Sequence, residues 1–155
     1  MEDYFPSLPE EATAPGISFS FANIEQPDFD FGPLPAWIEA VIQQHECTLG
    51  ALSYIFCSDP YLHQLNVEYL DHDTLTDIIT FPYAEPPLVS GDLYISLDRV
   101  ADNAQDRSLS FGQELRRVVI HGVLHLCGYG DKTDKEAARM RELEDEALAM
   151  LKGVS

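Results

Sequence analysis

The sequence predicts an α+β fold, a single layer of about four strands packed by several helices. Two features of the chain predict it. Stretches in which apolar and polar residues alternate are interspersed with helical patterns up to residue 96, and three further helical patterns then follow one another. One sheet covered by helices is the usual outcome of such a succession. The 155 residues, 45% of them hydrophobic, suffice for a sizeable core.

The N-terminal part of the chain differs from the rest in composition. Residues 1–16 hold three prolines and four acidic residues with little periodicity, so we expect a flexible acidic arm there and a single domain over 17–155. The first strand is expected at 17–22, where apolar and polar residues alternate. A helix at 35–46 follows from a proline at its start and an apolar stripe that includes Trp37.

The other elements follow from the same signals. A strand at 53–57 precedes a helix that starts at Ser58-Asp59-Pro60, with proline in the first turn, and runs to Tyr69. The remaining expected elements are strands at 78–81 and 91–96 and helices at 97–104, 111–127 and 135–151.

The longest helical pattern carries the most informative motif, His121-Gly-Val-Leu-His125, followed beyond a glycine by Asp131. Residues four apart share one helix face about 5–6 Å apart at Cβ, a span that two imidazole nitrogens can close onto one ion. Gly128 and Gly130 can adopt a positive φ, which would turn the chain back and bring Asp131 to the same ion. Two histidines and one carboxylate leave a coordination position open, as in catalytic zinc sites.

Ordinary packing is the other explanation of the motif, with two core or surface histidines and Asp131 as a solvated turn residue. The apolar residues around the histidines predict a buried helix, in which unpaired imidazoles would be costly, and this favours the metal. Cys127 is close to His125 in sequence, but its helical position points it to another face. Gly122 stands where zinc peptidases of the His-Glu-x-x-His type have a glutamate base, which argues against such a peptidase.

The charge of the chain is unusual. The formal net charge is −18, residues 1–98 contain 17 acidic residues and no lysine or arginine, and all nine cationic residues follow Asp98. Such a field repels polyanions, and nucleic-acid binding normally uses basic patches, so the charge counts against an RNA partner. Function at high ionic strength would remove this conflict, because salt screens surface charge.

The metal motif extends into a family resemblance. His121-Gly-x-Leu-His125-Leu-x-Gly128-Tyr129, with a ligand-type residue at the tenth position after His121, resembles the signature of the YbeY family, zinc-dependent single-strand-specific endoribonucleases of ribosomal RNA maturation. Further blocks agree in order and spacing: Leu65-Asn66-x-x-Tyr69, Asp73-x-x-Thr76-Asp77-Ile78-Ile79-Thr80-Phe81-Pro82, Gly91-Asp92, Glu136, Met140 and Leu143-Glu144. The resemblance covers roughly residues 65–144.

The resemblance implies one Zn²⁺ per chain, held by His121, His125 and Asp131, but the sequence departs from the family pattern at two positions. Asp131 stands where the family normally has histidine; a carboxylate is an accepted zinc ligand, although its charge should make a bound water less acidic. Alternatively, Asp131 caps the next helix and leaves two ligands. Leu70 replaces an arginine that, in the family, is thought to engage the RNA phosphate. His72 could substitute for this arginine when protonated, but an ordinary loop residue is the simpler interpretation of His72.

Asp77 belongs to the block that lines the family's active-site cleft, where it could orient a ligand imidazole as a hydrogen-bond acceptor. Alternatively, Asp77 is a turn residue that caps the following strand, and this role accounts for it equally well. No catalytic side chain beyond the metal ligands is identified, so the chemistry would rest on metal-bound water.

The resemblance implies a metallohydrolase, a single-strand-specific endoribonuclease acting in 16S rRNA 3′ end maturation and ribosome quality control. Its implied partners are single-stranded RNA, the small ribosomal subunit and assembly factors of that subunit. The alternative is a ribosome-assembly binding factor with a structural metal and decayed catalysis, as Leu70 would suggest. Because no apolar run approaches the ~18–20 residues of a membrane span and no signal peptide is evident, we expect a cytoplasmic location.

Overall fold

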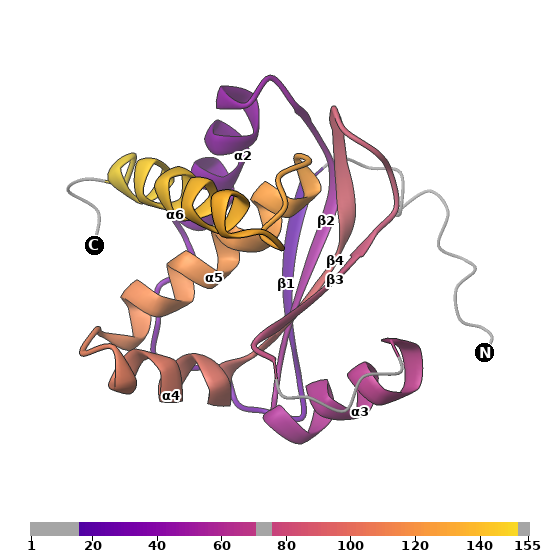
Figure 1. Ribbon diagram of the computed structural model, residues 1–155. Helices are drawn as coiled ribbons and strands as arrows, with labels where there is room; N and C mark the ends of the chain where they lie inside the picture. The colour runs from indigo at the N-terminus through magenta and orange to yellow at the C-terminus, as the bar shows by residue number, and fades with distance from the viewer. Residues whose placement is uncertain (1–15, 71–75, 152–155) are drawn as a thin grey trace.

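A computed structural model of the chain describes residues 16–70 and 76–151, and these form a four-stranded sheet with helices packed on it (Figure 1). The strands are β1 (Gly16–Ala22), β2 (Thr48–Cys57), β3 (Ile78–Pro82) and β4 (Leu88–Ser96). The sheet order is β1-β2-β4-β3, in which β1, β2 and β4 are parallel and β3 runs antiparallel to β4. The predicted α+β class is confirmed.

The helices divide between the two faces of the sheet. They are α2 (Leu34–Gln44), α3 (Asp59–Leu70), α4 (Leu97–Asp106), α5 (Phe111–Leu126) and α6 (Asp134–Ala149). Figure 1 shows α2, α5 and α6 on one side of the strands, with α6 beside α5. The main core lies on this side and includes the fully buried Tyr54 and Phe56, whereas Leu62 of α3 packs with Ile79 on the opposite face.

Two strands begin earlier than the alternation of residues predicted. β2 begins at Thr48 instead of residue 53, and β4 begins at Leu88 instead of residue 91. The two early segments pair with each other, but their register shifts between Leu49 and Leu52. Such an irregularity breaks the period of two, so alternation alone could not locate these strand starts.

Other predicted boundaries agree with the structure to within a few residues. The helix expected at 35–46 ends two residues sooner, at Gln44. The arm expected at 1–16 lies outside the described residues except for Gly16, which begins β1. No helix among the described residues is long and apolar enough to cross a membrane.

The helix that carries both histidines packs closely on the sheet at Gly122. A Cβ at this position would overlap Leu93 Cδ2 of β4 and lie 2.8 Å from Ile78 Cδ1 of β3. Glycine therefore sets the distance between α5 and the sheet, because it alone lacks this atom. A glutamate at this position, as in zinc peptidases, would point into the sheet.

We predict that Gly122→Ala lowers the free energy of unfolding by about 1–3 kcal/mol, because the added methyl group overpacks the interface between α5 and the sheet. Urea denaturation measures the change. Gly112→Ala is the matched control in the first turn of the same helix, where the added Cβ would lie 3.3 Å from its nearest neighbour, Phe29 Cε1. Equal loss of stability in both variants would contradict the packing role of Gly122.

Candidate metal centre

The end of α5 is built to reverse the chain. Cys127 is the C-cap, and Gly128 follows with φ of 111°. The backbone N–H of Gly128 donates to the carbonyl of His125 at 2.9 Å, which closes the turn. The prediction of a positive φ is confirmed for Gly128, since glycine tolerates this conformation without strain. Gly130 does not adopt a positive φ, so the turn uses this freedom at Gly128 and not at Gly130.

The start of α6 fixes the other end of the same turn. Thr133 is the N-cap: its side chain accepts from the backbone N–H of Glu136 at 3.0 Å, and the Glu136 side chain accepts in return from the N–H of Thr133. Glu136 also accepts from the N–H of Lys132 at 3.0 Å. Thr133 therefore performs the capping considered for Asp131, and the Asp131 carboxylate lies elsewhere.

That carboxylate lies against both imidazoles of α5. Its Oδ2 is 3.3 Å from His121 Nε2 and 3.5 Å from His125 Nε2. All three ligand atoms lie within 4.8 Å of one another. Ligands about 2.0–2.1 Å from a tetrahedral ion are spaced roughly 3.3 Å apart, so the two distances to Asp131 Oδ2 match the spacing around a zinc-sized ion. The side chains of His121, His125 and Asp131 are 23%, 30% and 38% exposed, which leaves the centre open on one side.

Both imidazoles are held by their other ring nitrogen. His121 Nδ1 is 2.7 Å from Glu144 Oε2, and His125 Nδ1 is 2.8 Å from the carbonyl of Tyr129. Metal-binding histidines are commonly oriented by such acceptors, which direct Nε2 toward the ion. The helix is buried as predicted, and its two histidines are partly buried and have hydrogen-bond partners at Nδ1. The ring orientation supports a metal centre.

Glu144 is the buried charge that connects this centre to its surroundings. It is 5% exposed and accepts from Arg117 Nη1 at 2.9 Å as well as facing His121. Burial raises the pKa of Glu144, but hydrogen bonds and charge from His121 and Arg117 outweigh it and lower the pKa overall. For His121, burial lowers the pKa. The stronger opposite effect comes from the carboxylates of Glu144, Asp131 and Asp77, so the pKa of His121 lies above its usual value. An incoming cation must therefore compete with a proton.

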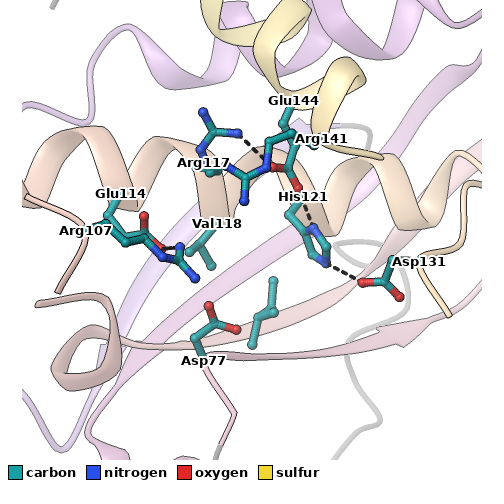
Figure 2. Close-up of a pocket in the computed structure, with 10 residues that line it drawn as sticks. Asp77, Arg107, Glu114, Arg117, Val118, His121, Asp131, Arg141 and Glu144 are labelled. Carbon is teal, nitrogen blue, oxygen red and sulfur yellow. Dashed lines mark hydrogen bonds and ion pairs between the residues drawn. The ribbon is translucent and has the colours of Figure 1, made fainter. Parts of the chain in front are cut away.

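A pocket of about 280 Å³ adjoins the centre and shares His121 and Asp131 with it (Figure 2). Its charged walls come from the residue before β3, the end of α4, α5 itself and α6. They comprise Asp77, Arg107, Glu114, Arg117, Arg141 and Glu144. Glu114 is buried and accepts from Arg107 Nη1 at 2.7 Å, and its Oε1 has no partner among the described residues. Burial raises the pKa of Glu114, and Arg107 partly offsets this.

A second hollow of about 390 Å³ lies at His125. Residues of β3 and the segment after it, Thr80, Pro82 and Pro86 among them, form most of its wall. His121 and Asp131 therefore line the charged pocket, whereas His125 lines a largely apolar hollow.

Asp77 lines the charged pocket, but it does not hold an imidazole. The acceptors at Nδ1 of the two histidines are Glu144 and Tyr129, and the negative charge of Asp77 contributes to raising the pKa of His121. Sequence reasoning did not single out Glu144 as this acceptor. A signal was present, since Glu144 lies on the same helix face as the buried Met140, Leu143 and Ala147, where an acid needs a partner.

Cys127 takes no part in the candidate centre. Burial, reinforced by neighbouring Cys47, raises the pKa of Cys127 to about 12, so the residue remains a thiol at neutral pH. The expectation that it faces away from the histidines agrees with the ligand group, which contains His121, His125 and Asp131.

Together these features define a class of α+β proteins with a potential metal-binding group on a helix and the turn that follows it. Comparisons with known proteins identify the family. The model of the family Endoribonuclease YbeY matches residues 22–152. The chain therefore belongs to the YbeY endoribonuclease family.

Individual relatives agree over most of the chain. It is 55% identical over 114 residues to an endoribonuclease YbeY of Flavobacterium johnsoniae, covering 74% of this chain and 82% of that protein. It is 51% identical over 135 residues to one of Porphyromonas gingivalis, covering 87% and 89%. A solution structure of a Thermotoga maritima protein superposes with a TM-score of 0.61 at 25% identity, covering 88% of this chain and 91% of that one.

We predict that Glu144→Gln weakens Zn²⁺ binding by about 10- to 100-fold, because the neutral amide no longer balances the imidazole of His121. Competition with a chromophoric chelator measures the affinity. Glu142→Gln is the matched control on the same helix, since Glu142 is exposed and pairs with Arg139. Unchanged Zn²⁺ affinity in Glu144→Gln would show that this carboxylate does not support the centre.

Proposed function

We propose that the protein is a zinc-dependent, single-strand-specific endoribonuclease that acts in 16S rRNA 3′ end maturation and ribosome quality control. The observation that carries this proposal is the spacing of His121 Nε2, His125 Nε2 and Asp131 Oδ2, which fits one zinc ion beside an arginine-containing pocket. Membership of the YbeY family supplies the substrate class. RNA, the small ribosomal subunit and its assembly factors are the proposed partners, and the cytoplasm is the proposed location.

In this proposal, His121, His125 and Asp131 hold the ion. A bound Zn²⁺ supplies Lewis-acid chemistry, because it acidifies water and polarises a phosphoryl oxygen. The chain itself fixes the ligand geometry: Glu144 and the Tyr129 carbonyl orient the imidazoles, and the caps at both ends of the turn hold Asp131. We propose that Asp77 supports the site through its negative charge, facing the pocket from the start of β3.

The replacement of arginine by Leu70 supports a second candidate, an assembly factor with a structural metal and no catalysis. The side chain of Leu70 and all of His72 lie outside the described part of the structure. The two candidates differ in RNA turnover. An assembly factor would co-sediment with the small subunit and leave single-stranded RNA intact.

We predict that wild type binds about one zinc ion per chain and cleaves single-stranded RNA, and that Asp131→Ala loses both, with cleavage reduced by at least about 100-fold. Asp131→His should retain zinc and cleavage, because imidazole is an equivalent ligand. Elemental analysis and cleavage of a labelled oligoribonucleotide measure these properties on the same samples.

Asp134→Ala is the matched control, since Asp134 is an exposed acid in the first turn of α6 and lies outside the ligand group. It should behave as wild type. Zinc bound equally by wild type and Asp131→Ala would refute the ligand assignment. Zinc bound by wild type without any RNA cleavage would favour the assembly factor.

A further inference from the structure

We propose that Arg141 binds a backbone phosphate of the single-stranded RNA next to the metal centre. This inference rests on the proposed function, because it assigns a part of that substrate to one side chain. Arg141 lies on the exposed side of α6, one turn before Glu144, and lines the charged pocket. Figure 2 shows its side chain extending from α6 beside Arg117, on the side of the pocket where His121 lies.

The pairing of the three pocket arginines singles out Arg141. Arg107 pairs with Glu114 at 2.7 Å. Arg117 pairs with Glu144 and with Asp145, each at 2.9 Å. Arg141 makes no hydrogen bond or ion pair with any residue in the ranges 16–70 and 76–151. Two of the guanidinium groups are thus neutralised by internal carboxylates, and the third has all its donors available to a ligand.

The balance of charge in the pocket depends on the metal centre. Four carboxylates and three arginines line the pocket. Two arginine–glutamate pairs cancel, which leaves Asp77 and Asp131 facing Arg141. Among the residues that line the pocket, this balance is negative without a cation, and a divalent ion at His121, His125 and Asp131 makes it positive. Asp145, the second partner of Arg117, is 59% exposed to solvent and lies outside this lining. An anion is then favoured between the ion and Arg141, in a chain whose overall charge repels polyanions.

The chemistry of the side chain specifies the kind of anion. The planar guanidinium presents a fork of N–H donors that matches two oxygens of a phosphate. Because the pocket and the metal centre share His121 and Asp131, a phosphodiester at the centre places itself or the next phosphate of the strand in this pocket. Single-stranded RNA is the polyanion that the proposed function provides.

The test compares Arg141→Gln with Arg139→Gln in the zinc-loaded full chain. Arg139 lies two residues earlier on α6, is exposed, and pairs with Glu142 at 3.2 Å. Both variants remove one positive charge from the same helix, so their difference reports the pocket and not the net charge. The probe is a short fluorescent oligouridylate, whose binding is followed by anisotropy over a salt series, with its integrity checked on gels and zinc content measured in parallel.

We expect Arg141→Gln to bind the probe about tenfold more weakly than wild type, as for loss of a charge-assisted hydrogen bond. The slope of log K against log salt should fall by about 0.7, the value for one phosphate contact on a single strand. Arg141→Lys should recover part of the affinity, because it keeps the charge without the fork. Arg139→Gln should stay close to wild type, and all variants should retain zinc.

Equal affinities and salt slopes for Arg141→Gln and Arg139→Gln, with wild type binding and cleaving RNA, would overturn the assignment of Arg141 and leave the proposed function intact. Wild type that carries zinc but neither binds nor cleaves the probe would overturn both.

Discussion

The geometry of the candidate metal centre depends on the contacts that the Glu144 carboxylate makes. It is buried where α6 meets α5, and its two oxygens engage Arg117 and His121. A buried charge of this kind is tolerated only when partners satisfy it, so the position of α6 and the orientation of the His121 ring are fixed together. The same contact directs His121 Nε2 toward Asp131 and places Arg141 at the edge of the pocket. The packing of α6 against α5 therefore determines how the His121 ring is oriented at the candidate metal centre.

The strong acidity of the chain is compatible with a polyanionic substrate because the decisive charges are local. Among the described acidic residues of the first 98 positions, only Asp77 lines the charged pocket, and salt at physiological ionic strength screens exposed charges that lie more than about 8 Å apart. At the candidate centre, arginines from α5 and α6 and from the end of α4 gather around one pocket, and the internal pairs determine which of them remains available. The net charge of the chain therefore bears on the long-range approach of RNA, whereas binding at the site depends on the local charges of the pocket.

Local patterns predicted the helix that carries both histidines well and the long-range contacts poorly. The spacing of His121 and His125, and the glycine that turns the chain back to Asp131, are properties of short segments, and the structure brings these three residues together. Glu144 lies 23 residues from His121, and its role follows from helix packing that no local period encodes. The starts of β2 and β4 escaped prediction for a related reason, since a register shift between paired strands removed the alternation on which the prediction relied.

X-ray absorption spectroscopy of the zinc-loaded protein can determine whether His121, His125 and Asp131 together hold one zinc ion. These three ligands would give a first shell of nitrogen and oxygen atoms about 2.0–2.2 Å from zinc, with imidazole scattering from two histidines. A sulfur shell near about 2.3 Å would place the ion at a cysteine such as Cys127 and would rule out this ligand set.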